Sequence, residues 1–167
     1  MPIVYRNGDL LQTKARYICH QVNCQGVMGS GVARQIKEKF PAAFTHYKLW
    51  CDKDANVRKR LSLSQSRLLG RAQVVYGFLA DGNASRTAIC NLYAQDRYGS
   101  DGKRYTDYQA FARCLTELKD HIPTSEPIAM PYNIGCGLGG GDWEIVLGII
   151  ERVLSGSYTV ELWKKQV

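Results

Sequence analysis

The sequence has no apolar run long enough to cross a bilayer and no cysteine pattern that would hold a metal. A spanning helix needs about 20 consecutive apolar residues, and the N-terminal residues lack the charged and then apolar segments of a secretory signal. The six cysteines are scattered, without a Cys-x-x-Cys pair or a histidine at ligand spacing. We therefore expect an intracellular, cytoplasmic protein with reduced cysteines, no membrane contact, and no metal or other cofactor.

Internal repeats, low-complexity tracts and linkers are also missing from the 167 residues. With 45% hydrophobic residues, a chain of this length can bury one sizeable core, which excludes disorder and predicts a single domain over residues 1–167. The formal net charge of +7 favours anionic partners. The basic residues are widely spread, however, and the short cluster from Val57 to Arg60 is interpreted as a solvated loop.

Short apolar runs alternate with segments of helical periodicity along the chain. The apolar runs predict strands at Ile3–Tyr5, Tyr17–Val22, Ala72–Leu79, Thr87–Tyr93, Ile128–Pro131 and Tyr158–Trp163. The periodic segments predict helices at Val32–Phe40, Ala42–Cys51, Tyr105–Lys119 and Trp143–Leu154. The segment from Asp52 to Ser66 has no clear period and is interpreted as an excursion. This alternation predicts a three-layer α/β/α sandwich around a mixed, largely parallel central sheet.

The stretch ICHQVNCQGVMGSGVARQI, residues 18–36, has the pattern of a strand, a glycine turn and a helix. Glycines let the backbone approach a phosphate without a Cβ in the way, and free N–H groups at a helix start attract anions. The spacing matches neither the dinucleotide fingerprint nor the nucleotide-triphosphatase loop. Taken alone, the segment is equally consistent with a tight turn that binds nothing.

A second stretch, IAMPYNIGCGLGGGDWEIV, repeats the order of strand, glycine loop and helix. Five glycines fall within its residues 135–141, and Asp142 stands where the helix begins. An open α/β sheet would place both loops at the carboxyl edge of its strands, where ligands bind. Two such loops can hold one diphosphate from both sides.

Three motifs in this order resemble those of macrodomains: NGDLL at residues 7–11, VNCQGVMGSGVA at residues 22–33 and GCGLGGGDW at residues 135–143. The resemblance covers essentially the whole chain. It is closest to the divergent branch of yeast-type ADP-ribose 1″-phosphate phosphatases, the terminal ADP-ribose glycohydrolase and the bacterial DNA de-ADP-ribosylating antitoxins. It implies a cleft for ADP-ribose or ADP-ribose 1″-phosphate, with ADP-ribosylated protein or nucleic acid as further partners.

The resemblance also implies which residues bind the ligand. Asp9 is expected to accept a hydrogen bond from the adenine amino group beside the Leu10 backbone, and Asn23 to bond the distal ribose hydroxyls. From the residues alone, either polar side chain can equally serve a turn. Tyr132 is expected to stack near the distal ribose. The two phosphate walls are expected from Gly29, Ser30, Gly31 and Val32, and from Gly135, Cys136, Gly137, Leu138, Gly139 and Gly140.

The sequence departs from the catalytic residues of the hydrolases in this branch. Where relatives that release ADP-ribose from an acidic side chain or a DNA base have a lysine, the aligned residue is Gln95. An amide cannot form a Schiff base or supply positive charge. The glycohydrolase's second-loop aspartate is replaced by Gly139. Lysine-assisted hydrolysis is therefore disfavoured.

The phosphatase pattern His-x-x-Asn-Cys is matched by residues 20–24. His20 is therefore the predicted catalytic residue, either as general acid or as the group that orients the attacking water, with Asp142 as a second polar group. The structural alternatives are a histidine hydrogen-bonded in the core and an aspartate that caps a helix. We expect an enzyme that removes phosphate from ADP-ribose 1″-phosphate. A non-catalytic ADP-ribose reader and a hydrolase acting on ADP-ribosylated protein or DNA are the alternatives.

Overall fold

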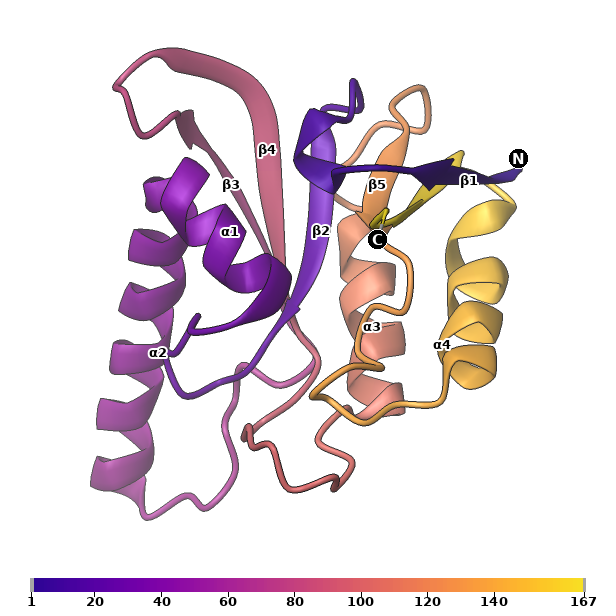
Figure 1. Ribbon diagram of the computed structural model, residues 1–167. Coiled ribbons are helices and arrows are strands. Elements are labelled where there is room, and N and C mark those ends of the chain that lie inside the picture. Colours follow the sequence, from indigo (N-terminus) through magenta and orange to yellow (C-terminus); the bar gives the residue numbers. More distant parts are fainter. Residues whose placement is uncertain (1, 167) are drawn as a thin grey trace.

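The computed structural model describes residues 2–166, and within them one six-stranded sheet lies between two layers of helices (Figure 1). The strands are β1 (Ile3–Asn7), β2 (Tyr17–Val22), β3 (Ala72–Phe78), β4 (Ala84–Tyr93), β5 (Ile128–Pro131) and β6 (Val160–Lys164). Their order across the sheet is β1-β6-β5-β2-β4-β3, and every neighbouring pair is parallel except β3 and β4. The predicted mixed, largely parallel sheet is confirmed.

The helices cover the sheet in two pairs, α1 with α2 on one face and α3 with α4 on the other (Figure 1). Their bounds are α1 (Gly31–Lys39), α2 (Pro41–Leu61), α3 (Tyr108–Leu118) and α4 (Trp143–Ile150), with a 3-10 turn at Leu10–Gln12 and a π-helical turn at Glu151–Ser155. The predicted three-layer α/β/α sandwich is confirmed. No helix in the described part of the chain is long and apolar enough to cross a membrane.

The central strand β2 is buried on both faces because it lies between β4 and β5 and under both helical layers. Tyr17 and Cys19 pack in the core formed with α3 and α4. Ile18 and Val22 point the other way, into the cores under α1 and α2. This two-sided burial makes β2 an almost continuous apolar run and fixes the position of the loop that follows it.

The predicted excursion between residues 52 and 66 is wrong for its first ten residues, because α2 continues to Leu61. Asp54 interrupts the apolar period there, since it lies on the buried face, where it accepts hydrogen bonds from Arg58 Nε (2.9 Å) and Ser66 Oγ (2.7 Å). The basic cluster interpreted as a loop therefore lies in the last turns of α2. The helix ends at Leu61, and its C-cap residue Ser62 has a left-handed φ of 56°.

Other helix and strand ends differ from the prediction by a few residues. The third helix begins at Tyr108 rather than Tyr105, because the Asp107 side chain caps it by accepting from Ala110 N. The strand β4 begins at Ala84, three residues before the predicted start, and Ala84 pairs with Phe78 of β3 beyond a register shift. None of these shifts moves the two glycine loops, which follow β2 and β5 at the same edge of the sheet.

Candidate functional site

Three adjoining compartments form one cleft along the carboxyl edge of the sheet. They have volumes of about 350, 350 and 330 Å³, in order from the turn after β1 to the loop after β4. The first and middle compartments share Val32, Pro131 and Tyr132. The middle and distal compartments share Gln21, Ser30, Ala33, Gln95, Leu138 and Gly139. The cleft is therefore continuous and passes between the two glycine loops.

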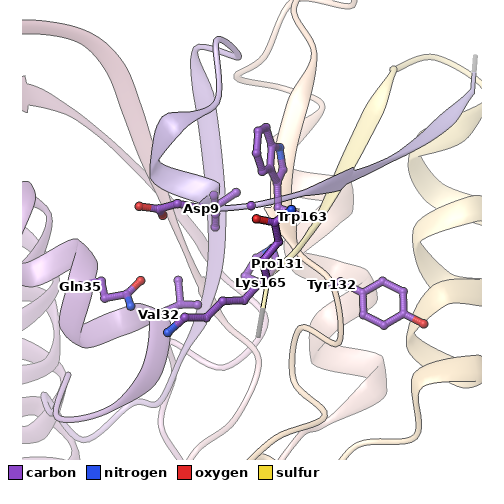
Figure 2. Close-up of a pocket in the computed structure, with 10 residues that line it drawn as sticks. Asp9, Val32, Gln35, Pro131, Tyr132, Trp163 and Lys165 are labelled. Atoms are coloured by element: carbon purple, nitrogen blue, oxygen red, sulfur yellow. The ribbon is translucent and has the colours of Figure 1, made fainter.

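The first compartment lies between the turn after β1, the start of α1 and the residues after β6 (Figure 2). Asp9 begins the 3-10 turn by accepting a hydrogen bond from Leu11 N at its Oδ1 (2.9 Å). Among the described residues its Oδ2 has no partner, so this oxygen is free to accept from a ligand. Leu10 is buried beside it, and Trp163 and Lys165 line the compartment further along.

The first glycine loop brings the start of α1 to the cleft. Ser30 is the N-cap of α1, but its side chain makes no capping hydrogen bond, so the first N–H groups of the helix have no side-chain acceptor. Gly31 and Val32 line the middle compartment, and Gly29 lines the distal one. Backbone donors and the helix dipole together favour an anion at this position.

Asn23 lies at the distal end of the cleft with 8% of its surface exposed. Its Oδ1 accepts from Gln25 N (2.9 Å) and from the Tyr47 hydroxyl (2.7 Å), and its Nδ2 donates to Val27 O (2.9 Å). One N–H of Nδ2 remains for a ligand. The side chain thus holds the first loop in shape as well as lining the distal compartment.

The second glycine loop is held by the segment that precedes α3. The Thr106 hydroxyl donates to Gly135 O (2.7 Å), and the backbone N–H groups of Tyr105 and Thr106 both donate to Gly139 O (2.8 and 3.0 Å). A Cβ at Gly139 would meet Thr106 Oγ1 at 2.6 Å and Gly135 O at 2.7 Å, whereas a Cβ at Gly137 would meet nothing within 4 Å. Packing therefore requires glycine at position 139. At position 137, the absence of a side chain keeps the middle compartment open.

Of the remaining residues of the predicted second phosphate wall, one lines the cleft and two do not. Leu138 is 60% exposed and lines the middle and distal compartments. Cys136 and Gly140 are not among the lining residues. Gly140 has a left-handed φ of +69° and packs against the backbone of Lys103, so it shapes the loop from behind.

A chain of amides crosses the floor between the two loops. Gln21 Nε2 donates to Gln95 Oε1 (2.7 Å) and to Thr106 Oγ1 (2.8 Å), and Gln95 Nε2 donates in turn to Arg97 O (2.9 Å). The Oε1 of Gln21 is buried without a partner among the described residues. The motifs do not predict Gln21, and its only signal is a polar residue near the end of an apolar strand. Gln95 lies in the cleft, where the hydrolases of the branch are expected to have lysine.

His20 is buried under α2 and takes part in the wall of the middle compartment. Its Nε2 lies 2.6 Å from Asn91 Oδ1. Because Asn91 Nδ2 donates to Ala43 O and Gln73 Oε1, the Asn91 oxygen faces His20, and Nε2 is the protonated nitrogen. Burial lowers the pKa of His20 to about 4. The imidazole is therefore neutral at pH 7, and its Nδ1 has no partner among the described residues.

Asp142 and Tyr132 lie apart from the distal compartment. The Asp142 carboxylate is exposed and caps α4 by accepting from Glu144 N (2.9 Å), and the residue lines none of the three compartments. The Tyr132 ring lies 4.8 Å from that of Trp143 and is directed toward α4 (Figure 2). Tyr132 lines the first and middle compartments but not the distal one, so the structure places it nearer the Asp9 end of the cleft than the Asn23 end.

Charged side chains are confined to the first compartment, where Asp9 and Lys165 line the cleft. Among the described residues, no Asp, Glu, Lys or Arg lines the middle or distal compartment. Nor do any three His, Cys, Asp or Glu side chains between residues 2 and 166 gather closely enough to hold a metal ion. Amides, hydroxyls, backbone groups and the neutral imidazole of His20 therefore supply the polar chemistry of the cleft beyond its first compartment.

The buried neutral His20 predicts a pH-dependent stability. Its pKa is about 4 when folded and about 6.5 when unfolded, so only the unfolded chain gains this proton between these values. We expect the free energy of unfolding contributed by His20 to be constant above pH 6.5 and to fall by about 3 kcal/mol as the pH is lowered to 4. Urea unfolding of wild type and His20→Gln between pH 7 and pH 4 measures it. An equally steep loss in the variant would contradict the assignment.

The fold and cleft define an α/β/α sandwich whose candidate ligand site lies between two glycine loops at the carboxyl edge of a mixed sheet. The chain belongs to the macrodomain family, because residues 19–150 match the family described as Macro domain. A protein from Enterobacteria phage T4, an uncharacterized 17.5 kDa protein, is 31% identical over 162 residues, which are 93% of this chain and 92% of that protein. The resemblance inferred from the motifs is confirmed.

Two relatives have names that state an activity. A DNA ADP-ribosyl glycohydrolase of Mycobacterium tuberculosis is 34% identical over 148 residues, which are 86% of this chain but 36% of that protein. An ADP-ribose 1″-phosphate phosphatase of Saccharomyces cerevisiae is 29% identical over 133 residues, which are 74% of this chain and 67% of that protein. Among solved structures, the macrodomain of Thermus aquaticus DarG is 26% identical and superimposes with a TM-score of 0.71 over 99% of both chains.

Proposed function

We propose that the protein binds ADP-ribose along the cleft and removes phosphate from ADP-ribose 1″-phosphate. The continuous cleft of three compartments supports binding, since its order matches adenosine, diphosphate and distal ribose. The free Oδ2 of Asp9 suits the adenine amino group. The start of α1 and the Gly137 side of the second loop face each other across the middle compartment, where the diphosphate would lie.

The hydrogen-bond donors of the distal end are the observation that supports a phosphorylated ligand. A phosphate there would meet the free N–H of Asn23 and the backbone of Gly29 and Ser30, and no carboxylate of the described residues lines that compartment to repel it. In phosphate release, a water oxygen bonds to phosphorus while the bond from phosphorus to the ribose oxygen breaks, and that oxygen leaves as a hydroxyl carrying a proton from the water. The name of the Saccharomyces cerevisiae relative supports the same reaction.

Of the two roles predicted for His20, general acid catalysis is disfavoured, and orienting the water stays a sequence prediction, because His20 lines the middle compartment and not the distal one. With a pKa of about 4, His20 has no imidazolium proton to donate at neutral pH. Its unprotonated Nδ1 can accept a hydrogen bond. Asp142 stays a sequence prediction, and the proposed reaction does not use it, because its carboxylate caps α4 outside the cleft.

Release of ADP-ribose from DNA is the second candidate, and the basic helical layer favours it. Residues 34–67 hold nine of the 22 Lys and Arg residues but three of the 15 Asp and Glu residues. Positive charge of this kind attracts nucleic acid, and the Mycobacterium tuberculosis relative is named for this activity. Gln95 in the lysine position argues against it. A reader that binds ADP-ribose without turnover requires only the cleft.

One set of measurements separates these functions. Calorimetric titration with ADP-ribose is expected to give micromolar binding, followed in the same sample by phosphate release from ADP-ribose 1″-phosphate. An ADP-ribosylated DNA oligonucleotide and an ADP-ribosylated protein are assayed in parallel for free ADP-ribose. Binding with release of ADP-ribose but not of phosphate would replace the phosphatase by a hydrolase, and binding without turnover would indicate a reader. Absence of binding would refute the proposed cleft.

A further inference from the structure

The Tyr47 hydroxyl connects α2 to the first glycine loop. Tyr47 is fully buried, and its hydroxyl donates to Asn23 Oδ1 (2.7 Å) while accepting from the backbone N–H groups of Gly26 (3.1 Å) and Val27 (3.0 Å). A phenol has one donor and two acceptor positions, so all three are occupied. None of the three compartments is lined by Tyr47. Its polar atom therefore acts on the loop and not on a ligand.

These contacts determine which way the Asn23 amide faces. Oδ1 receives two donors, Tyr47 O–H and Gln25 N–H, and Nδ2 gives one hydrogen to Val27 O. Rotating the amide by half a turn would set Nδ2 against the Gln25 N–H and against the Tyr47 hydroxyl, whose two acceptor positions are already filled by Gly26 N–H and Val27 N–H, and would set Oδ1 against the Val27 carbonyl. All three contacts would then be repulsive, because donor would face donor and acceptor would face acceptor. Asn23 consequently offers the cleft an N–H and no free oxygen.

We propose that Tyr47 is a positioning residue that fixes Asn23 as a hydrogen-bond donor, so that the distal compartment selects ligands by acceptor oxygens of the terminal ribose or its phosphate. This inference rests on the proposed function, since it concerns how the same cleft recognises the distal part of ADP-ribose. It adds a residue from α2 to which the motifs assign no role. It also gives Asn23 a defined direction, donating and not accepting.

The surroundings of Tyr47 keep the phenol in place and protonated. Its ring stacks on Tyr93 (centroids 5.7 Å apart), which stacks in turn on Trp50 (6.0 Å). Burial raises the pKa of Tyr47 well above its ordinary value, so the O–H donor persists through the neutral and mildly alkaline range. Tyr93 provides a matched comparison, because its hydroxyl is also buried but bonds to Gln73 Oε1 (3.1 Å), away from the loop.

The test compares ADP-ribose with ADP, which lacks the distal ribose, in wild type, Tyr47→Phe and Tyr93→Phe. Tyr47→Phe is expected to weaken ADP-ribose by about ten- to a hundredfold and to leave ADP within about twofold. Tyr93→Phe is expected to leave both ligands within about twofold. Calorimetry supplies the affinities, and thermal unfolding of each variant shows that it is folded at the titration temperature.

A second variant examines the donor itself. Asn23→Asp keeps an oxygen toward Tyr47 and Gln25, has no N–H, and sets its second oxygen against the Val27 carbonyl, which lines the distal compartment only. It is therefore expected to weaken ADP-ribose at least as much as Tyr47→Phe, again with little change for ADP. Unchanged ADP-ribose affinity in either variant would overturn the inference. So would an equal loss for both ligands, which would mean a general loosening of the cleft. If wild type itself fails to bind ADP-ribose, the proposed function falls first and the inference falls with it.

Discussion

Gly137→Val is expected to reduce ADP-ribose affinity by about a hundredfold or more while leaving the free energy of unfolding nearly unchanged. A Cβ at Gly137 meets nothing within 4 Å, and no left-handed φ is required there, so the valine side chain extends freely from the loop. The space that it enters is the middle compartment, between the second loop and the start of α1. A diphosphate in that compartment would collide with the added methyl groups, since side chains of this size exclude the backbone approach that glycine allows.

Calorimetric titration of Gly137→Val with ADP-ribose measures the loss, and urea unfolding measures stability. Gly148→Val is the matched control, because Gly148 is exposed on α4 and a Cβ there also meets nothing within 4 Å. The control is expected to bind as wild type does. Wild-type affinity in Gly137→Val would show that the ligand does not pass between the two loops, and a loss of stability would show that the glycine has a packing role.

Gly139→Ala is expected to lower the free energy of unfolding by about 2 to 3 kcal/mol, although it adds a single methyl group. That Cβ would lie 2.6 Å from Thr106 Oγ1 and 2.7 Å from Gly135 O, and the second contact is with backbone, which cannot rotate away. Relief requires the loop to move off Thr106 and to lose hydrogen bonds that Gly139 O now accepts from Tyr105 N and Thr106 N. Urea unfolding followed by circular dichroism measures the change.

Gly156→Ala is the matched control for this prediction. Gly156 has an ordinary helical φ of −69° and an open environment, so alanine there is expected to stabilise the protein by about 0.5 kcal/mol through the unfolded chain. If the free energy of unfolding falls in Gly139→Ala and rises in Gly156→Ala, the loss at Gly139 is caused by its close contacts and not by alanine itself. A Gly139→Ala protein that unfolds at the wild-type urea concentration would mean that the second loop yields more easily than its hydrogen bonds indicate.

Much of the fold could be predicted from the sequence, because buried parallel strands are apolar runs and the surface-facing helices keep their period. The exception is the second half of α2, where Asp54 occupies a buried position that a periodicity search expects to be apolar. Its partners Arg58 and Ser66 neutralise and hydrogen-bond the carboxylate, but the second of these lies beyond the helix end. The sequence does not show that these partners meet Asp54, because Ser66 reaches it only in the folded chain.

The glycine loops were also predictable from the sequence. Their residues are contiguous, and a loop in which the backbone must approach a ligand or another segment closely is rich in glycine. Gln21 and Tyr47 were not, because each acts through a hydrogen bond to a residue at least 20 positions away. His20 was predicted by its motif, but its neutral state depends on burial beneath α2, which the motif does not contain. Local patterns therefore predicted the two loops that border the cleft, whereas the orientation of the polar side chains in the cleft depends on contacts between residues far apart in the sequence.

The connection between β4 and α3 has a further consequence for divergence among related proteins. An isolated bridge pairs Gln95 with Thr106 and closes this connection at its base. Its outer residues, Tyr98 and Gly99, line the distal compartment. Insertions or deletions in the connection between residues 96 and 105 would therefore resize one end of the cleft without altering any strand of the sheet. A change in this one surface segment would alter the size of the group that the distal compartment can accept, while the sheet and helices stay as they are.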